Sequence, residues 1–222
     1  MANASTKVYS HLTELKKYFE EDIKQLHGLS ISAEAEEQKR GYSFTTTVKE
    51  GPNAPYHWVI PWPPIPRCTI PQGLTLLSVA DYLGYLVKSG NNNYKSTEEN
   101  MIEFFAKAES YGICSHIPAN QLLLLNQCAR QEMVHNYLPK LDLEVSYHSG
   151  NPTGKLFFLH TETGGVVLNV NELKWIVLET LDKLLSDPDQ PLYQNMEAHY
   201  LHAEAEYEAQ VKTLIQNVKA SL

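Results

Sequence analysis

Apolar side chains recur at three- and four-residue steps over long parts of the chain, a spacing typical of amphipathic helices. In the first half they predict a helix over about residues 8–28. They predict a second helix over 74–88, which is apolar nearly all round and therefore buried. Ser96 and Glu99 have the spacing of a capping box, so they predict the start of a third helix, which should end at Gly112. This half of the chain is expected to be mainly helical.

The second half predicts three further helices whose ends are marked by proline or asparagine. Pro118 suits the first position of a helix that Pro139 would end, and Asn171 suits the cap of a helix that breaks at Pro188. A long last helix covers about residues 192–218. The apolar stripe that this last helix is expected to bury consists of Met196, Tyr200, Tyr207, Val211 and Leu214.

Two regions alternate between apolar and polar residues as strands do. Residues 42–48 and 56–60 predict a hairpin, and the four prolines within 61–66 predict a stiff extended loop after it. Two or three antiparallel strands are predicted later in the chain, over 141–145, 155–159 and 166–168.

The expected fold is a mainly α helical bundle with small antiparallel β-hairpin insertions. No change in composition marks a linker, so residues 1–222 are expected to form a single domain, with a β and proline-rich insertion at about 41–72 and a β insertion at about 141–169. With 43% hydrophobic residues the chain has ample material for a core. Its formal charge is -8 and it has only three arginines, so it offers no broad basic surface for nucleic acid. Any contact with RNA must be local.

Other features predict a cytoplasmic protein without a membrane span. The first residues show neither a basic segment nor an apolar segment of a secretory signal. The most apolar stretch, 74–87, contains Asp81 and is shorter than the roughly 20 residues that a membrane helix needs. Cys68, Cys114 and Cys128 do not form a C-x-x-C pair, so neither a disulfide framework nor a zinc knuckle is indicated.

The residues with the clearest chemical pattern lie between positions 130 and 140. Arg130 is followed after four residues by His135, then after one residue by Tyr137, and the helix is expected to end at Pro139, next to Lys140. Histidine provides a group with a near-neutral pKa that can move a proton, and arginine provides a permanent cation that stabilises developing negative charge. The planar guanidinium also matches non-bridging phosphate oxygens.

This Arg-x4-His-x-Tyr pattern resembles the signature of the HEPN superfamily, in which the motif forms the active site of metal-independent endoribonucleases, many of them toxins or antiviral defence effectors. The resemblance implies a HEPN-like bundle with His135 as general acid or base, Arg130 as phosphate clamp, and no metal or cofactor. Five residues along an α-helix advance by about 500°, so the two side chains point some 140° apart on one helix. The family solves this by dimerisation, which implies a homodimer with a composite cleft.

The resemblance also implies roles for two neighbouring residues. Tyr137 and Lys140 would line the cleft. In one branch of the family, the tyrosine is nucleotidylated by a nucleotidyltransferase antitoxin, which implies such a partner here and would block the cleft by charge and bulk. An alternative for Tyr137 is simple packing at the dimer face.

Less specific interpretations remain open for each motif. Arg130 and His135 can instead form surface salt bridges that fix the end of a helix, and the chain would then be a non-catalytic HEPN-like dimerisation or interaction protein. His199, His202 and Glu206 share a helix face and can ligate a metal, but their acidic neighbours favour a solvated face. The aromatic side chains of 58–62 can stack a ligand, although a cover over one end of the core is the favoured interpretation.

Overall fold

The computed structural model describes residues 6–40, 45–48, 56–59, 68–89, 96–126, 143–147, 151–159, 164–187 and 189–221. This part of the chain is mainly helical with a small β component, as the sequence predicts. The helices are α1 (Lys7–Arg40), α2 (Thr69–Val87), α3 (Thr97–Ser110), α4 (Ala119–Leu124), α6 (Val170–Ser186) and α7 (Gln190–Ser221). The strands are β1 (Thr45–Val48), β2 (Tyr56–Val59), β3 (Leu143–Ser146), β4 (Phe157–Leu159) and β5 (Val166–Asn169).

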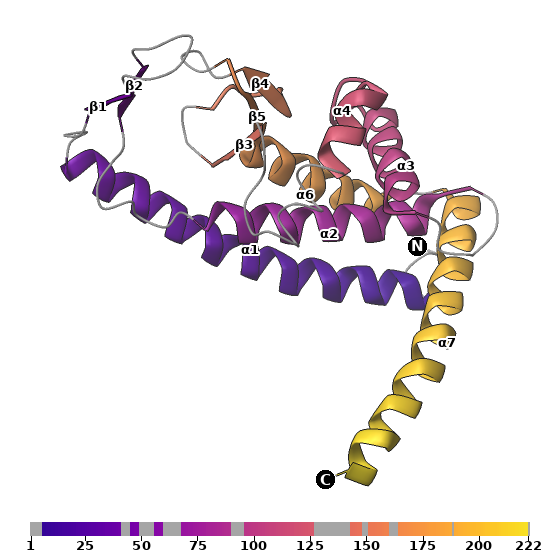
Figure 1. Cartoon of the computed structure of the whole chain (residues 1–222). Coiled ribbons are helices and arrows are strands. Elements are labelled where there is room, and N and C mark those ends of the chain that lie inside the picture. Colours follow the sequence, from indigo (N-terminus) through magenta and orange to yellow (C-terminus); the bar gives the residue numbers. More distant parts are fainter. Residues whose placement is uncertain are drawn as a thin grey trace.

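Helix α2 is the centre of the bundle. It runs beside α1, carries α3 on another side, and also packs against α6 and α7 (Figure 1). Leu76, Leu77, Leu83 and Leu86 are all fully buried, which confirms the predicted central helix. The helix begins at Thr69, five residues before the predicted start, because Cys68 has a left-handed backbone (φ 53°) and Pro71 fits the first turn.

Helix α1 continues well past Gly28, so the predicted end there is wrong. A single exposed glycine costs a helix only about 1 kcal/mol, and residues beyond it gain packing. Ser30 is buried and donates to the carbonyl of Leu26 at 3.1 Å, while the Gln72 amide of α2 donates to Ser30 Oγ at 2.6 Å. Contact with α2 therefore continues past Gly28, and the helix ends at Arg40.

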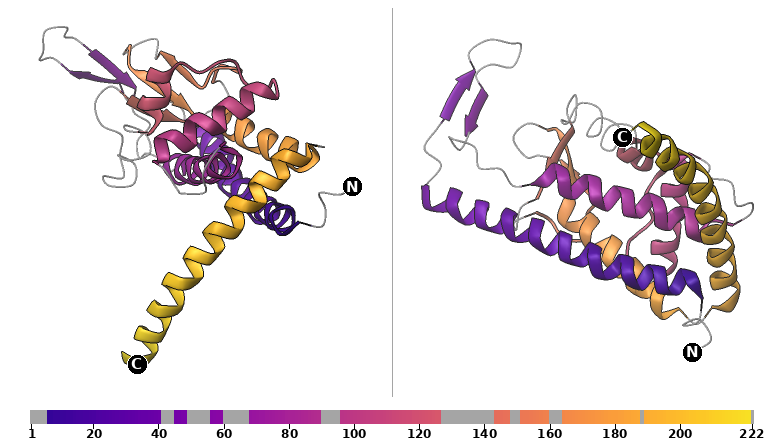
Figure 2. Two further views of the ribbon diagram at one scale, coloured as in Figure 1. Left: turned by 90° about the vertical axis from the view of Figure 1, so that its right-hand side faces the viewer. Right: turned by 90° about the horizontal axis from the view of Figure 1, so that it is seen from below.

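The first turn of α1 is held by the other end of the chain. Glu197 of α7 accepts hydrogen bonds from the backbone N–H groups of Lys7 at 3.2 Å and Val8 at 2.8 Å. These are the first N–H groups of the helix, which have no carbonyl partner within it. The two terminal helices are thus joined directly (Figure 2).

The predicted hairpin is confirmed, since β1 and β2 pair antiparallel with Thr45 opposite Val59. The second β region forms a three-stranded sheet in the order β3-β5-β4. Strand β4 is antiparallel to β5, but β3 is parallel to β5, so the prediction of antiparallel strands only is wrong. Alternation of side chains fixes which face of a strand is buried, whereas it carries no information on strand direction.

The ends of the later helices differ from the prediction in detail. Pro118 is the N-cap of α4 rather than its first residue, and Asn169, not Asn171, caps α6 by accepting from the Glu172 N–H at 3.4 Å. The capping box of Ser96 and Glu99 is present at the start of α3, as predicted.

Helix α7 packs on the bundle through its first half only. Met196 is fully buried, but Tyr207 is 68% exposed and Leu214 is 60% exposed, so their predicted burial is wrong. The second half of α7 extends beyond the bundle (Figures 1 and 2). Among the described residues, no helix combines the length and the apolar character needed to cross a bilayer.

Candidate functional site

The predicted catalytic and cleft residues, Arg130, His135, Tyr137 and Lys140, lie outside the described residues, as does Pro139. The structure describes the elements on both sides of them. Helix α4 leads into this segment and strand β3 follows it. These two elements show how the parts of the chain before and after the motif are held in the bundle.

Both flanking elements are anchored in the core. Leu122 and Leu125, at and just after α4, are buried, and α4 packs against α3. On the other side Leu143 of β3 is buried and β3 contacts both α2 and α6. The segment that carries the motif thus starts and ends on fixed parts of the bundle.

Tyr147, directly after β3, connects three elements through one hydroxyl group. It is buried and hydrogen-bonded to Nδ1 of His27 on α1, and it accepts from Nζ of Lys174 on α6 at 3.0 Å. The ammonium group also lies 5.3 Å from the centre of the tyrosine ring. We name these three residues the Tyr147 cluster.

Burial shifts every pKa in the Tyr147 cluster towards the neutral form. Burial raises the pKa of Tyr147 to about 12, with a smaller effect from the charge of Glu34. The pKa of Lys174 is lowered by burial, and that of His27 is lowered by burial and by the nearby Lys174 charge. A neutral His27 can accept from the Tyr147 hydroxyl, so the cluster acts as a clamp that holds the end of β3.

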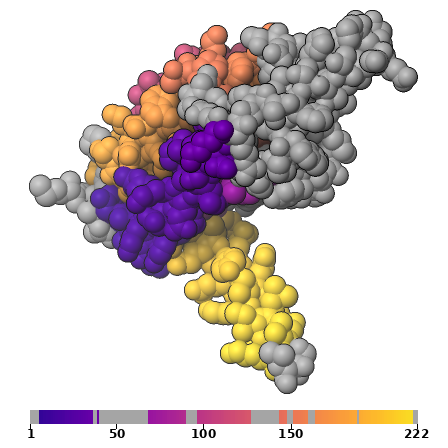
Figure 3. Space-filling model, turned by 90° about the vertical axis from the view of Figure 1, so that its left-hand side faces the viewer, coloured from indigo at the N-terminus to yellow at the C-terminus, as the bar shows by residue number. Residues whose placement is uncertain are grey.

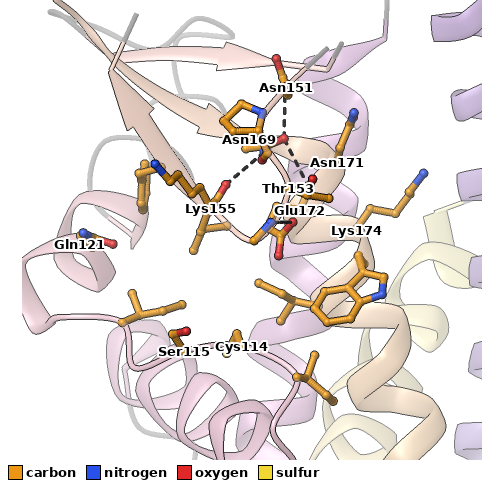
Figure 4. A pocket seen from close by; sticks show the side chains of 18 of the residues that line it. Cys114, Ser115, Gln121, Asn151, Thr153, Lys155, Asn169, Asn171, Glu172 and Lys174 are labelled. Atoms are coloured by element: carbon orange, nitrogen blue, oxygen red, sulfur yellow. Dashed lines mark hydrogen bonds between the residues drawn. The ribbon is translucent and has the colours of Figure 1, made fainter. Parts of the chain in front are cut away.

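A pocket of about 710 Å³ opens beside this clamp (Figure 4). The α3–α4 connection with Gln121, the segment 151–157 and the first turns of α6 form its walls. Ile113, Leu156 and Ile176 are buried and provide an apolar floor. Trp175 is 45% exposed and presents its indole at the pocket.

Asn169 organises the polar wall of the pocket. Its amide donates to the carbonyls of Pro152 at 2.8 Å and Lys155 at 3.0 Å, and its oxygen accepts from Asn151 at 3.3 Å as well as capping α6. Glu172 is buried and accepts from the Gly154 N–H at 2.9 Å (Figure 4). The 151–155 turn is therefore fixed to the start of α6 by side-chain hydrogen bonds.

The pocket offers polar and aromatic contacts rather than an activated nucleophile. Burial, together with smaller effects from the charges of Glu109 and Glu172, raises the pKa of the Cys114 thiol to about 11, so the thiol stays protonated at neutral pH. A flat apolar ring could stack on Trp175. Among the described residues, no three His, Cys, Asp or Glu side chains are grouped as metal ligands.

The interpretation of His199 and its neighbours as a solvated face is wrong for His199 itself. This residue is fully buried because α7 packs it against α2, where its Nε2 lies 3.1 Å from the Lys88 carbonyl and the Tyr85 hydroxyl donates to its own carbonyl at 3.0 Å. Burial lowers the pKa of His199. His202 is half-buried and lies 3.5 Å from Glu206.

Sequence reasoning missed the Asn169 network and the Tyr147 cluster. The spacing of Asn169 and Glu172 is itself a helix-start pattern, and it could have identified the cap two residues before Asn171. The Tyr147 cluster joins residues far apart in sequence, so no local pattern indicates it. Trp62 and the side chain of Trp58 lie outside the described residues.

No family model, curated protein or solved structure matches the chain. The resemblance to the HEPN superfamily therefore depends on the motif residues and on the helical character of the fold.

Proposed function

We propose that this protein is a metal-independent endoribonuclease of the HEPN type, acting as a toxin or an antiviral defence effector. The observation that carries the proposal is the Arg130-x4-His135-x-Tyr137 motif in a mainly helical bundle. The motif segment is flanked by α4 and β3, both fixed to the core, which is the support that a precise site requires.

In the proposed reaction the 2′-hydroxyl of the RNA attacks the adjacent phosphorus and the 5′-oxygen of the next nucleotide leaves. His135 moves a proton as general acid or base, and the guanidinium of Arg130 stabilises the negative charge of the phosphorane. Tyr137 and Lys140 line the cleft and contact the RNA backbone. The products are a 2′,3′-cyclic phosphate and a free 5′-hydroxyl, so no bond needs water or a metal in this step.

The site is proposed to need two copies of the chain. On one helix Arg130 and His135 would point some 140° apart, and a two-fold axis brings the motif of a second copy alongside. The acidic balance of the chain, -8 overall, then restricts RNA binding to the cleft where the basic residues of both copies meet.

The decisive experiment is cleavage of single-stranded RNA by the purified protein in EDTA. We expect cleavage by the natural chain, and a loss of at least about 100-fold for Arg130→Ala and for His135→Ala, as is typical for groups that act on the transition state. Arg40→Ala and His57→Ala change the same residue types outside the motif and serve as matched controls. Circular dichroism confirms that each variant is folded. Full activity of both motif variants would overturn the proposal.

Tyr137 is proposed as the site at which a nucleotidyltransferase antitoxin switches the enzyme off. Tyr137→Phe removes the hydroxyl group that would be modified and keeps the ring. The cleavage that this variant shows should be insensitive to a co-expressed nucleotidyltransferase, and its mass should not change, whereas the natural chain gains the mass of one or more nucleotides.

A non-catalytic interaction protein is the second candidate, and one observation favours it: α7 carries exposed apolar side chains at Tyr207 and Leu214. In that case the chain assembles but cleaves no RNA, and the motif variants change neither property.

A further inference from the structure

The second half of α7 projects from the bundle as a single helix (Figures 1 and 3). Its first half is held by buried Tyr193 and Met196 and by the bond of Glu197 to α1. Further along the helix, Glu204 forms an ion pair with Lys7 of α1 at 3.2 Å. Beyond that point α7 continues to Ser221.

The face that packs on the bundle continues into the projecting part. At 100° per residue, Tyr193, Met196 and Tyr200 lie on the same side of the helix as Tyr207 and the apolar residues after it. We name this continuation the α7 stripe; it consists of Tyr207, Val211, Leu214 and Val218, of which Val211 is half-buried and the other three are exposed. Tyr207 is 68% exposed, Leu214 60% and Val218 55%.

Most helical stability in proteins comes from packing of an apolar face rather than from helix propensity. A partner on the α7 stripe would therefore stabilise the projecting half of the helix. The spacing of the stripe, alternating four and three residues, is that of a helix pair rather than of a solvated surface.

The charges beside the stripe indicate which partner fits. Along one flank the charged residues are Glu204 and Glu208 near the bundle and Lys212 and Lys219 nearer the tip, with the exposed Ile215 between the two lysines. In an antiparallel helix pair related by a two-fold axis, equivalent flanks face each other. The acidic half of one copy then lies against the basic half of the other.

A parallel pair would not have this complementarity. There the flank would face the opposite flank of the second helix, which begins with another acidic residue, Glu206, and has no lysine. Glu208 and Lys212 already form an ion pair within the helix at 2.8 Å. In the antiparallel pair, Glu208 and Lys212 of one copy would lie near the two-fold axis, beside Lys212 and Glu208 of the other copy.

We propose that the α7 stripe is a homodimer interface in which two copies pair antiparallel, with the two-fold axis near Val211, midway between the acidic and basic residues. The partner is a second copy of this chain, because the same segment supplies both complementary halves. This interface is independent of the ribonuclease proposal, since α7 contains no motif residue.

Disulfide cross-linking tests both the partner and the direction of pairing. In full-length Val211→Cys the new thiols of two copies meet at the axis, and mild oxidation should give a covalent dimer whose bond is located by mass spectrometry of peptides. In Val218→Cys the new thiols are far apart in an antiparallel pair and should not cross-link. Equal cross-linking at both positions indicates parallel pairing and overturns the proposal, as does the absence of a 211–211 bond.

Sedimentation equilibrium gives an independent readout. Leu214→Lys places a charge in the stripe and should weaken dimerisation at least about 10-fold, which corresponds to 1.4 kcal/mol. Gln216→Lys adds the same charge on the opposite side of the helix and should leave the dimer unchanged. A monomeric natural chain, or a dimer that Leu214→Lys does not affect, overturns the proposal. RNA cleavage by the same samples is scored separately, so failure of the interface and failure of the nuclease are distinguishable.

A charge exchange completes the test. Lys212→Glu with Lys219→Glu makes the whole flank acidic and should prevent self-association. Glu208→Lys makes the other chain more basic, and a mixture of the two chains should form heterodimers. Failure of the mixture to associate while the all-acidic chain still dimerises overturns the antiparallel arrangement.

Discussion

A methyl group placed on Gly84 of α2 would stand 1.8 Å from the backbone carbonyl oxygen of Asn100 on α3. The two helices therefore pack backbone against backbone at this point. Asp81, one turn earlier on α2, accepts from the Asn100 side-chain amide at 2.8 Å and closes the same contact. The position of α3, and of α4 beyond it, depends on this approach.

Gly84→Ala should accordingly destabilise the protein, although alanine is the better helix former. The helices must separate, and overpacking of this kind costs about 3 kcal/mol. Gly28→Ala is the matched control, because nothing lies within 4 Å of a Cβ there and the change should stabilise α1 by about 0.5–1 kcal/mol. Urea unfolding of the three proteins measures both effects. Equal stability of Gly84→Ala and the natural chain would show that α2 and α3 do not pack this closely.

Asn169→Ala should cost more than the loss of a normal helix cap. The cap itself contributes about 1 kcal/mol, and the loss of the hydrogen bonds to the carbonyls of Pro152 and Lys155 would cost about 0.5–1.5 kcal/mol each. Ser96→Ala removes a cap alone and provides the comparison. A loss of stability for Asn169→Ala no larger than that for Ser96→Ala would contradict the network described for the pocket wall.

The protein should lose stability as the pH falls below about 6.5. The pKa of His27 is lowered in the folded protein by burial and by Lys174, while in the unfolded chain it has its ordinary value near 6.5. Between 6.5 and the lowered pKa the unfolded chain binds more protons, so acid favours unfolding. Burial lowers the pKa of His11 and His199 as well, in the same direction.

Urea midpoints at pH 7.5 and 5.5 measure this dependence. We expect the lower midpoint at pH 5.5 and a smaller difference between the two pH values in His27→Gln, which cannot be protonated. A midpoint that is constant or rises towards pH 5.5 would contradict the burial of these imidazoles.

Cys114 should react slowly with iodoacetamide at pH 8. Because its pKa is raised to about 11, only a small fraction is thiolate, and the rate should rise about tenfold per pH unit up to that value. A small unstructured cysteine peptide with a pKa near 8.5 serves as control in the same tube. Peptide mass spectrometry separates Cys114 from the other thiols. A rate for Cys114 equal to that of the peptide would contradict its burial.

The sequence predicted those features that local patterns determine. Ser96 and Glu99 identified the start of α3, and the continuous apolar character of 74–88 identified the central helix. Features that depend on distant contacts were missed. Gly28 suggested a helix end because glycine often follows the last residue of a helix. The hydrogen bond between Ser30 and Gln72, which are 42 residues apart, cannot be recognised from a local pattern.

The same reasoning explains the errors around β5 and α7. Periodicity identified the strand β3 but not its parallel pairing, and it showed the apolar stripe of α7 but not where the bundle ends beneath it. At the candidate site, the motif was identified from residue types and spacing alone. The Tyr147 cluster could be identified only from the structure, because its residues come from α1, α6 and the end of β3.

The bond between Glu197 and the first turn of α1 has a consequence for biosynthesis. A ribosome makes α1 before it makes the carboxylate that accepts from its leading N–H groups, because Glu197 follows Lys7 by 190 residues. These N–H groups therefore have to be satisfied by water until Glu197 has been synthesised. A nascent chain interrupted before α7 would lack this bond, whereas a chain that includes α7 can form it.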